Sequence, residues 1–149
     1  MKLSVSNTNA PVWRDITVKS ELPKQLKALE ELSKNLWWVW NSEAKALFRS
    51  IDPDSWRRDG ENPVLILQRL TSDRIAELIA DDAFMAELGK VYADFKEYMA
   101  KPMRKDIPSV SYFSMEYGLC NCLKIYSGGL GVLAGDYIKE ASDSCVPMT

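Results

Sequence analysis

The sequence predicts an α/β protein in which a mainly helical N-terminal region leads into the first strand–loop–helix unit of a parallel sheet. Through residues 23–100, apolar side chains recur at spacings of three and four, which is typical of helices that bury one face. Residues 109–115, SVSYFSM, have the β-branched and aromatic content of a strand, and a glycine cluster at 128–131 precedes a helix-like pattern. We therefore expect a helical region over 1–103 and the truncated start of an α/β domain over 104–149.

Size and composition indicate one globular unit. The chain has 149 residues, of which 46% are hydrophobic and 27% are charged. Its formal net charge of -2 gives no electrostatic case for nucleic acid, and no apolar run approaches the roughly 20 residues of a membrane span. Residues 1–13 lack the apolar core of a signal peptide, so we expect a cytoplasmic protein that binds neither nucleic acid nor membrane.

The cysteines are predicted to be ordinary thiols. There are three, Cys120, Cys122 and Cys145, and an odd number without a secretory signal indicates a reducing compartment. Three thiolates would leave a zinc site one ligand short unless a carboxylate joined them, so we expect no metal. The chain contains no histidine, which excludes Ser–His and Cys–His nucleophilic catalysis within it.

The helical region is predicted to start at Pro23, because the N–H that proline lacks would be unpaired in the first turn. Ser42 is predicted to cap a second helix, and residues 52–56 and 58–63 are predicted to form turns. Upstream, residues 1–20 alternate weakly and are expected to form a short strand or an extended arm. The first helix carries one apolar stripe, formed by Leu26, Leu29, Leu32, Leu36 and Trp40.

Three further helices are expected before the α/β part. Pro63 begins a short apolar one, Ser72 or Asp73 opens the next, and Asp81 or Asp82 opens a long one. The apolar residues that share a face of the long helix are Phe84, Leu88, Val91, Phe95 and Met99.

The α/β part follows a basic linker between Pro102 and Pro108. A helix is predicted from about Leu130 to Ala141, and residues 146–148 are predicted to begin a second strand. We expect the chain to end before that strand pairs with the first.

Three tryptophans lie within four residues, Trp37, Trp38 and Trp40. Tryptophan faces stack on sugars, so a carbohydrate platform is one interpretation. Aromatic residues at helical spacing more often fill a core, and we favour that interpretation.

The glycine cluster, Gly128, Gly129 and Gly131, lies where a helix is predicted to begin. Such clusters have two physical causes: backbone angles that other residues avoid, or a ligand that lies against bare backbone. The start of a helix offers unpaired N–H donors and a partial positive charge, which suit a phosphate or a phosphorylated sugar.

Three interpretations compete for this loop. The glycines serve only a tight turn and close packing; or Gly129, Gly131 and Ala134 form the G-x-G-x-x-A fingerprint of a dinucleotide-binding oxidoreductase; or the loop binds a sugar phosphate. The fingerprint should follow its strand immediately, yet about a dozen residues separate the predicted strand from Gly128.

Two motif blocks resemble the α-glucan phosphorylases, the glycogen, starch and maltodextrin phosphorylase family. They are YFSMEYGL at 112–119 and IYSGGLGVLAGDYIKEASD at 125–143. Upstream, residues 35–56 and 62–67 look like the helical N-terminal region of the bacterial branch. The resemblance runs from about Trp13 to the last residue.

The resemblance implies a GT-B fold of two Rossmann-like domains, of which residues 104–149 would be the beginning. It implies glucosyl transfer between an α-1,4-glucan and orthophosphate, giving glucose 1-phosphate with retention. It also implies pyridoxal phosphate, whose lysine lies outside this chain. A homo-oligomer is compatible with the sequence. The chain alone is expected to be inactive.

In the family, amides of the glycine loop hold the substrate phosphate and the sugar. By resemblance, these positions are Gly128, Gly129, Leu130 and Gly131. Glu116 matches an acidic residue at the sugar site of family members.

Departures from the family limit what carries over. Val132 stands where animal and plant members have an arginine after the loop, and the connection between the two blocks is short. A glycogen or starch synthase that uses a nucleotide sugar is an alternative, but Tyr126 and Ser127 replace its usual Lys-Thr. A non-catalytic helical interaction module also remains open for the fragment.

Overall fold

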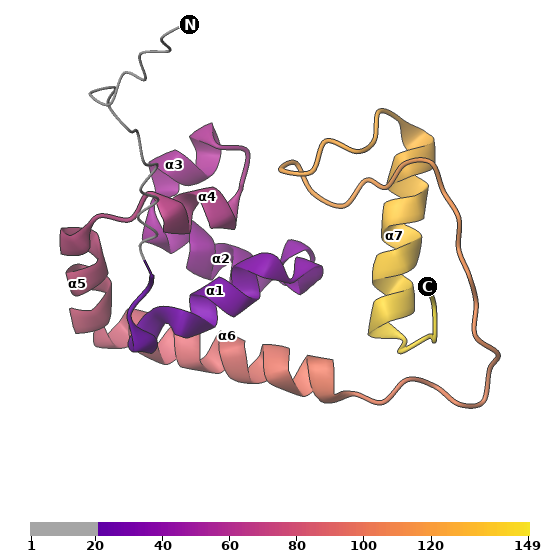
Figure 1. Cartoon of the computed structure of the whole chain (residues 1–149), viewed down its shortest axis with the longest axis horizontal. Helices are drawn as coiled ribbons and strands as arrows, with labels where there is room; N and C mark the ends of the chain where they lie inside the picture. Colours follow the sequence, from indigo (N-terminus) through magenta and orange to yellow (C-terminus); the bar gives the residue numbers. More distant parts are fainter. Residues whose placement is uncertain (1–20) are drawn as a thin grey trace, which may run out of the picture.

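The structure, a computed structural model, describes residues 21–149. The strand or arm predicted for residues 1–20 lies outside the described residues. Figure 1 shows a group of packed helices, a long irregular connection, and one helix, α7, standing to the side. The elements in order are η1 (Lys24–Leu26), α1 (Lys27–Lys34), η2 (Leu36–Val39), α2 (Ser42–Ile51), α3 (Pro53–Arg58), α4 (Pro63–Gln68), α5 (Ser72–Ala80), α6 (Asp82–Ala100) and α7 (Gly129–Asp143).

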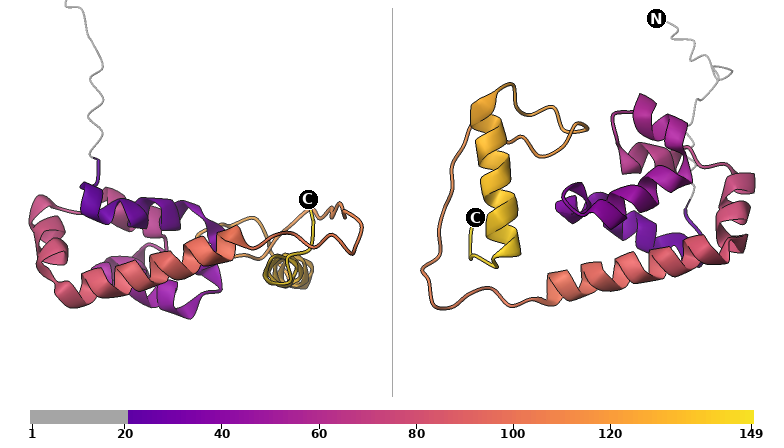
Figure 2. Two further views of the ribbon diagram at one scale, coloured as in Figure 1. Left: turned by 90° about the horizontal axis from the view of Figure 1, so that it is seen from below. Right: turned by 180° about the vertical axis from the view of Figure 1, so that it is seen from behind.

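Helix α6 is the longest helix of the helical group and runs along one side of it (Figure 1, and the right-hand view of Figure 2). The side chains of Phe84, Leu88, Val91 and Phe95 are buried at the predicted spacing. Met99 is 54% exposed, so the prediction that it shares this buried face is wrong. Met99 lies one residue before the end of α6, where its sulfur is 3.7 Å from Asn35 Nδ2. Asp81 caps α6 by accepting from the N–H groups of residues 83 and 84.

The first predicted stripe is interrupted at Asn35. Helix α1 ends at Lys34 and Asn35 is extended, with its side chain accepting a hydrogen bond from Trp37 N at 2.9 Å. An asparagine side chain competes in this way with helical hydrogen bonds. The chain continues as η2, which leaves Leu36 37% exposed, so the prediction of one continuous stripe through Leu36 is wrong.

The tryptophan cluster lies mainly in the core, which confirms the interpretation favoured over a carbohydrate platform. Trp37 and Trp38 are 5% and 2% exposed. The Trp37 ring centroid lies 5.5 Å from that of Phe95 on α6, and the Trp38 ring packs edge-on against Trp56 at 5.9 Å. A sugar platform built on the faces of Trp37 and Trp38 is therefore excluded by burial.

Two local predictions need correction. Residues 52–56 are not a turn but the start of α3, because Asp52 accepts from Ser55 N at 3.0 Å and Pro53 occupies the first helical position. Asn41, not Ser42, caps α2, since its side chain accepts from Ala44 N at 2.8 Å.

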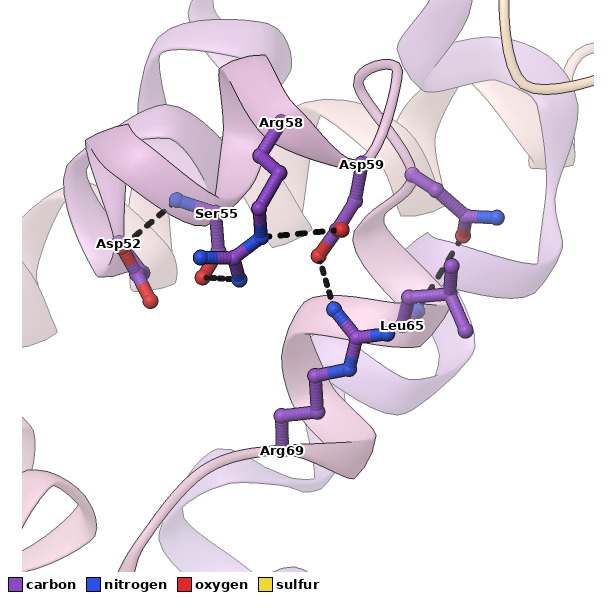
Figure 3. Close-up of polar contacts among 7 residues, drawn as sticks. Asp52, Ser55, Arg58, Asp59, Leu65 and Arg69 are labelled. Atoms are coloured by element: carbon purple, nitrogen blue, oxygen red, sulfur yellow. Dashed lines mark hydrogen bonds and ion pairs between the residues drawn. The ribbon is translucent and has the colours of Figure 1, made fainter.

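The turn between α3 and α4 is confirmed, and it is fixed by a polar network (Figure 3). Gly60 and Glu61 both have positive φ, 66° and 61°. Beside them, the Asp59 carboxylate, only 10% exposed, forms ion pairs with Arg58 and Arg69. The turn thereby brings α4 back against α3.

The predicted strands are reduced to one isolated parallel bridge, Val110 with Met148. Val110 N donates to Pro147 O at 2.9 Å, Thr149 N donates to Val110 O at 2.9 Å, and Tyr112 N donates to Thr149 O at 2.8 Å. The expectation that the first strand lacks a partner is thus wrong, although neither segment is long enough to form a strand within residues 21–149. The helical half of the α/β prediction is confirmed, and the Rossmann-like sheet stays a prediction.

Helix α7 extends the predicted 130–141 helix by about one residue at its start and two at its end. Within residues 21–149, no helix is both long and apolar enough to cross a membrane.

The ion pairs of Asp59 generate a testable pH dependence. Burial raises the pKa of this carboxyl, but hydrogen bonds and charges from Arg69 and Arg58 outweigh burial and lower it overall. A lowered folded-state pKa stabilises the fold above the unfolded pKa of about 3.9, and this stabilisation is lost as the pH falls. We expect Asp59→Asn to reduce the free energy of unfolding at pH 7, and the difference from the unsubstituted chain to shrink below about pH 4.

Urea unfolding across pH measures this difference. Asp54→Asn is the matched control, because the Asp54 side chain is 86% exposed and its one ion pair in the described part of the chain is with Arg57 on the same helix. An Asp59→Asn effect equal at pH 7 and pH 3, or no larger than the Asp54→Asn effect, would contradict the assignment.

Candidate functional site

The candidate site is the glycine turn at the start of α7. The helix begins at Gly129, and its N-cap, Gly128, supplies no side-chain hydrogen bond. The first intrahelical bond at this end runs from Val132 N to Gly128 O. The amides of Gly129, Leu130 and Gly131 therefore have no intrahelical acceptor, as in any first turn.

Backbone strain does not explain these glycines. Gly128 is extended, with φ -156° and ψ -164°, a conformation open to any residue. Among all seven glycines, only Gly60 has a positive φ. The first of the two possible causes is therefore excluded for the loop.

Close packing explains Gly131 and, one turn later, Gly135. A Cβ on Gly131 would lie 2.5 Å from Tyr126 Cβ, and one on Gly135 would lie 2.2 Å from Gly118 O. Both distances are far below van der Waals contact. Gly118 N also donates to Gly131 O at 2.6 Å, so the segment around Gly118 lies directly on the α7 backbone. The purely structural interpretation is thus correct for these positions.

Gly128 and Gly129 differ from the packed glycines. Both are exposed, and a Cβ added at either position would meet no atom within 4 Å. Neither strain nor packing requires glycine there. Bare, accessible backbone at a helix start is what an approaching anion needs.

Glu116 lies beside this turn. Its Oε2 accepts a hydrogen bond from Ser127 N at 2.7 Å, and its own backbone carbonyl accepts from Ser114 Oγ at 2.8 Å. A Cβ on Gly131 would come within 3.2 Å of Glu116 Oε2. The structure therefore brings together the predicted site residues: Glu116, Gly128, Gly129, Leu130 and Gly131.

Three residues that organise the site were missed by sequence reasoning: Gly118, Tyr126 and Gly135. A signal was present, because Gly131 and Gly135 are four apart and so share one helix face. Such spacing of small residues permits close backbone approach. The partner, Gly118, lies in the other motif block and could not be matched to that face without the fold.

Two of the three cysteines, Cys120 and Cys122, lie on the loop between the two blocks. Cys120 and Cys122 are half-buried free thiols with sulfurs 2.6 Å apart. Burial, together with the hydrogen bond and charge of Cys120, raises the pKa of Cys122 to about 12, which keeps this thiol protonated and unreactive near neutral pH. No group of three or more potential metal ligands occurs in the part of the chain that the structure describes.

Residues 22–123 match the family described as "Protein of unknown function (DUF3417)". The chain belongs to this DUF3417 family.

Several relatives carry the names of phosphorylases. The chain is 39% identical over 147 residues to a glycogen phosphorylase of Mycobacterium tuberculosis (strain ATCC 25618 / H37Rv), which covers 91% of this chain and 17% of the relative. It is 41% identical over 138 residues to a maltodextrin phosphorylase of Thermococcus litoralis, with coverage of 88% and 16%. A glycogen phosphorylase of Aquifex aeolicus is 40% identical over 131 residues, with coverage of 86% and 19%.

The resemblance to α-glucan phosphorylases is therefore confirmed as a similarity of sequence. The chain spans between 16% and 19% of the length of these relatives. No solved structure matches the chain significantly.

The two kinds of glycine should respond differently to alanine. Gly135→Ala forces a Cβ into Gly118 O, so we expect a loss of about 1–3 kcal/mol of local stability, typical of overpacking. Gly129→Ala meets open space at the first helical position and should not lower stability by more than about 0.5 kcal/mol. Amide hydrogen exchange along α7 measures both effects. Similar losses in the two variants would show that Gly129 is also a packing residue.

Proposed function

We propose that the chain is the N-terminal part of an α-glucan phosphorylase and that its glycine turn binds the phosphate of orthophosphate or glucose 1-phosphate. The observation that carries this proposal is the pair of open glycines, Gly128 and Gly129, for which neither strain nor packing accounts. The names of the relatives support the substrate class: an α-1,4-glucan as glucosyl donor and orthophosphate as acceptor.

The chemistry of the turn suits this role. The amides of Gly129 and Leu130 are free of intrahelical acceptors and lie at the positive end of the helix dipole. Preorganised N–H donors of this kind stabilise negative charge that develops on a transferring phosphate. The absence of side chains at residues 128 and 129 lets phosphate oxygens reach the amides directly.

Glu116 acts on the sugar rather than the phosphate in this proposal. Its Oε2 is engaged by Ser127 N, which fixes the carboxylate at the edge of the turn. No hydrogen bond to its Oε1 occurs within residues 21–149, so this oxygen remains an acceptor for a sugar hydroxyl. A carboxylate beside a phosphate site also repels a misplaced anion and so favours one position along the turn.

Pyridoxal phosphate belongs to the same proposal. When bound, it supplies a phosphate group for proton transfer, and we assign no residue of this chain to holding it. The chain's own residues bind and orient the substrate phosphate and one sugar unit. Residues 104–149 would begin a Rossmann-like domain of a GT-B fold, and the fragment alone would be inactive.

The alternatives receive less support. A dinucleotide fingerprint needs an open Gly131, but Tyr126 and Glu116 close the space around it. A nucleotide-sugar synthase would be expected to have Lys-Thr where Tyr126 and Ser127 stand. No observation favours a purely docking role for the helical group.

Gly129→Val in the full-length protein tests the proposal. The branched side chain would project from the turn into the space needed by the phosphate, although no protein atom lies within 4 Å of its Cβ. Loss of one such donor costs on the order of 3 kcal/mol, so we expect kcat/KM for orthophosphate and for glucose 1-phosphate to fall at least about a hundredfold. Initial-rate kinetics in both directions measure the loss.

Gly89→Val is the matched control, because Gly89 is also exposed, helical and free of neighbours around an added Cβ. It should leave kcat/KM within about twofold of the unsubstituted enzyme. A folded Gly129→Val enzyme with normal kinetics would refute the site. Activity with a nucleotide sugar instead of glucose 1-phosphate would favour the synthase.

A further inference from the structure

Helix α7 stands beside the helical group and is tied to it at its C-terminal end (Figure 1). Asp143, the last residue of α7, accepts from Trp40 Nε1 at 3.0 Å and from Tyr98 OH at 2.8 Å. The Tyr98 hydroxyl also lies 2.7 Å from Ser142 Oγ. We call these four residues, Trp40, Tyr98, Ser142 and Asp143, the Asp143 clasp.

The position of Asp143 runs against the intrinsic preference of a helix. A carboxylate at a helix C-terminus faces the negative end of the dipole, which disfavours it. Two donors from outside the helix compensate for this here. Trp40 directly follows η2 and Tyr98 belongs to α6. The two hydrogen bonds therefore join α7 to the helical group.

The donors of the clasp persist at physiological pH. The indole N–H of Trp40 does not titrate in this range. Burial, with further contributions from Asp143, raises the pKa of Tyr98 to about 12 although the Ser142 hydroxyl opposes it. The Tyr98 phenol therefore remains protonated, and a hydrogen-bond donor, near neutral pH.

The clasp and the glycine turn are the two ends of one rigid element. Helix α7 has 15 residues, which corresponds to a length of about 22 Å at 1.5 Å per residue. A rotation of about 5° around the clasp would displace the turn by about 2 Å over this length. A second contact steadies the other end, where Cys120 and Cys122 pack against the helical core.

We propose that the Asp143 clasp positions the phosphate-binding turn, so that Trp40, Tyr98 and Asp143 are positioning residues for phosphorolysis. This inference rests on the proposed function. It assigns to the helical group of the DUF3417 family a role in binding the substrate. The group holds the C-terminal end of α7 and so fixes the position of the open amides at the N-terminal end, where the phosphate would bind. Displacements of about 1 Å at a reacting group cost roughly a hundredfold in rate, so small rotations at the clasp matter.

The test uses the full-length enzyme with bound cofactor. Asp143→Ala removes the acceptor, and we expect kcat/KM for orthophosphate to fall tenfold to a hundredfold. Asp143→Asn keeps an amide oxygen in the same place and should recover most of this loss. Tyr98→Phe keeps the ring beside Trp37 and removes only the hydroxyl, so it should give a smaller loss of the same kind. Adding Tyr98→Phe to Asp143→Ala should cost less than Tyr98→Phe costs alone, because only the contact of the hydroxyl with Ser142 is then left to lose.

Asp136→Ala is the matched control on the same helix, because the Asp136 side chain is 69% exposed and, among residues 21–149, forms an ion pair only with Lys139. It should leave kcat/KM unchanged. Asp143→Ala and Tyr98→Phe would overturn the inference if they lowered the melting temperature but had the same kcat/KM as Asp136→Ala. The clasp would then be merely structural.

Gly129→Val separates this failure from that of the proposed function. A defective Gly129→Val enzyme beside kinetically normal clasp variants refutes the clasp alone. Normal kinetics in both refute the phosphate site itself. Should Asp143→Ala not fold, Asp143→Asn and Tyr98→Phe still decide, because each preserves the shape of the contact.

Discussion

The close approach of two backbones at Gly118 is the constraint on which the candidate site depends. Gly118 N donates to Gly131 O at 2.6 Å, and Gly118 O occupies the space that a side chain on Gly135 would need. This contact holds the segment of Glu116 against the first turns of α7 and places its carboxylate beside Ser127 N. Close packing therefore accounts for Gly131 and Gly135 on one face of α7. Gly128 and Gly129, at the start of the helix, have no such neighbours.

The two parts of the chain differ in how completely they bury apolar surface. In the helical group, interlocking rings such as Trp38 with Trp56, and Phe48 stacked on Trp56, close the core. In residues 104–149, Phe113, Met115 and Leu133 are 90%, 89% and 68% exposed. Large exposed apolar side chains in neighbouring positions are typical of surfaces that another layer covers. This supports the proposal that residues 104–149 begin a larger domain. The Asp143 clasp and the loop that carries Cys120 and Cys122 join these residues to the helical group.

Much of the helical group could be predicted from the sequence, because proline, capping residues and apolar spacing are local signals. Pro63, Asp81 and the stripe from Phe84 to Phe95 were placed correctly for this reason. Asn35 and Pro53 were misread, since an asparagine inside a stripe and a proline at a first helical position each fit two local structures. The residues proposed for the site were also named through motif resemblance, and their role stays a prediction. Their division into packed and open glycines was not, because it depends on Gly118 and Tyr126, which reach α7 only through the fold.

The most direct test of the central claim is an experimental structure of the complete polypeptide bound to orthophosphate or glucose 1-phosphate. The account predicts phosphate oxygens within about 3 Å of the backbone nitrogens of Gly129 and Leu130, with Glu116 facing the sugar. A phosphate bound elsewhere, with the turn at Gly128 covered by side chains from the remainder of the polypeptide, would contradict it.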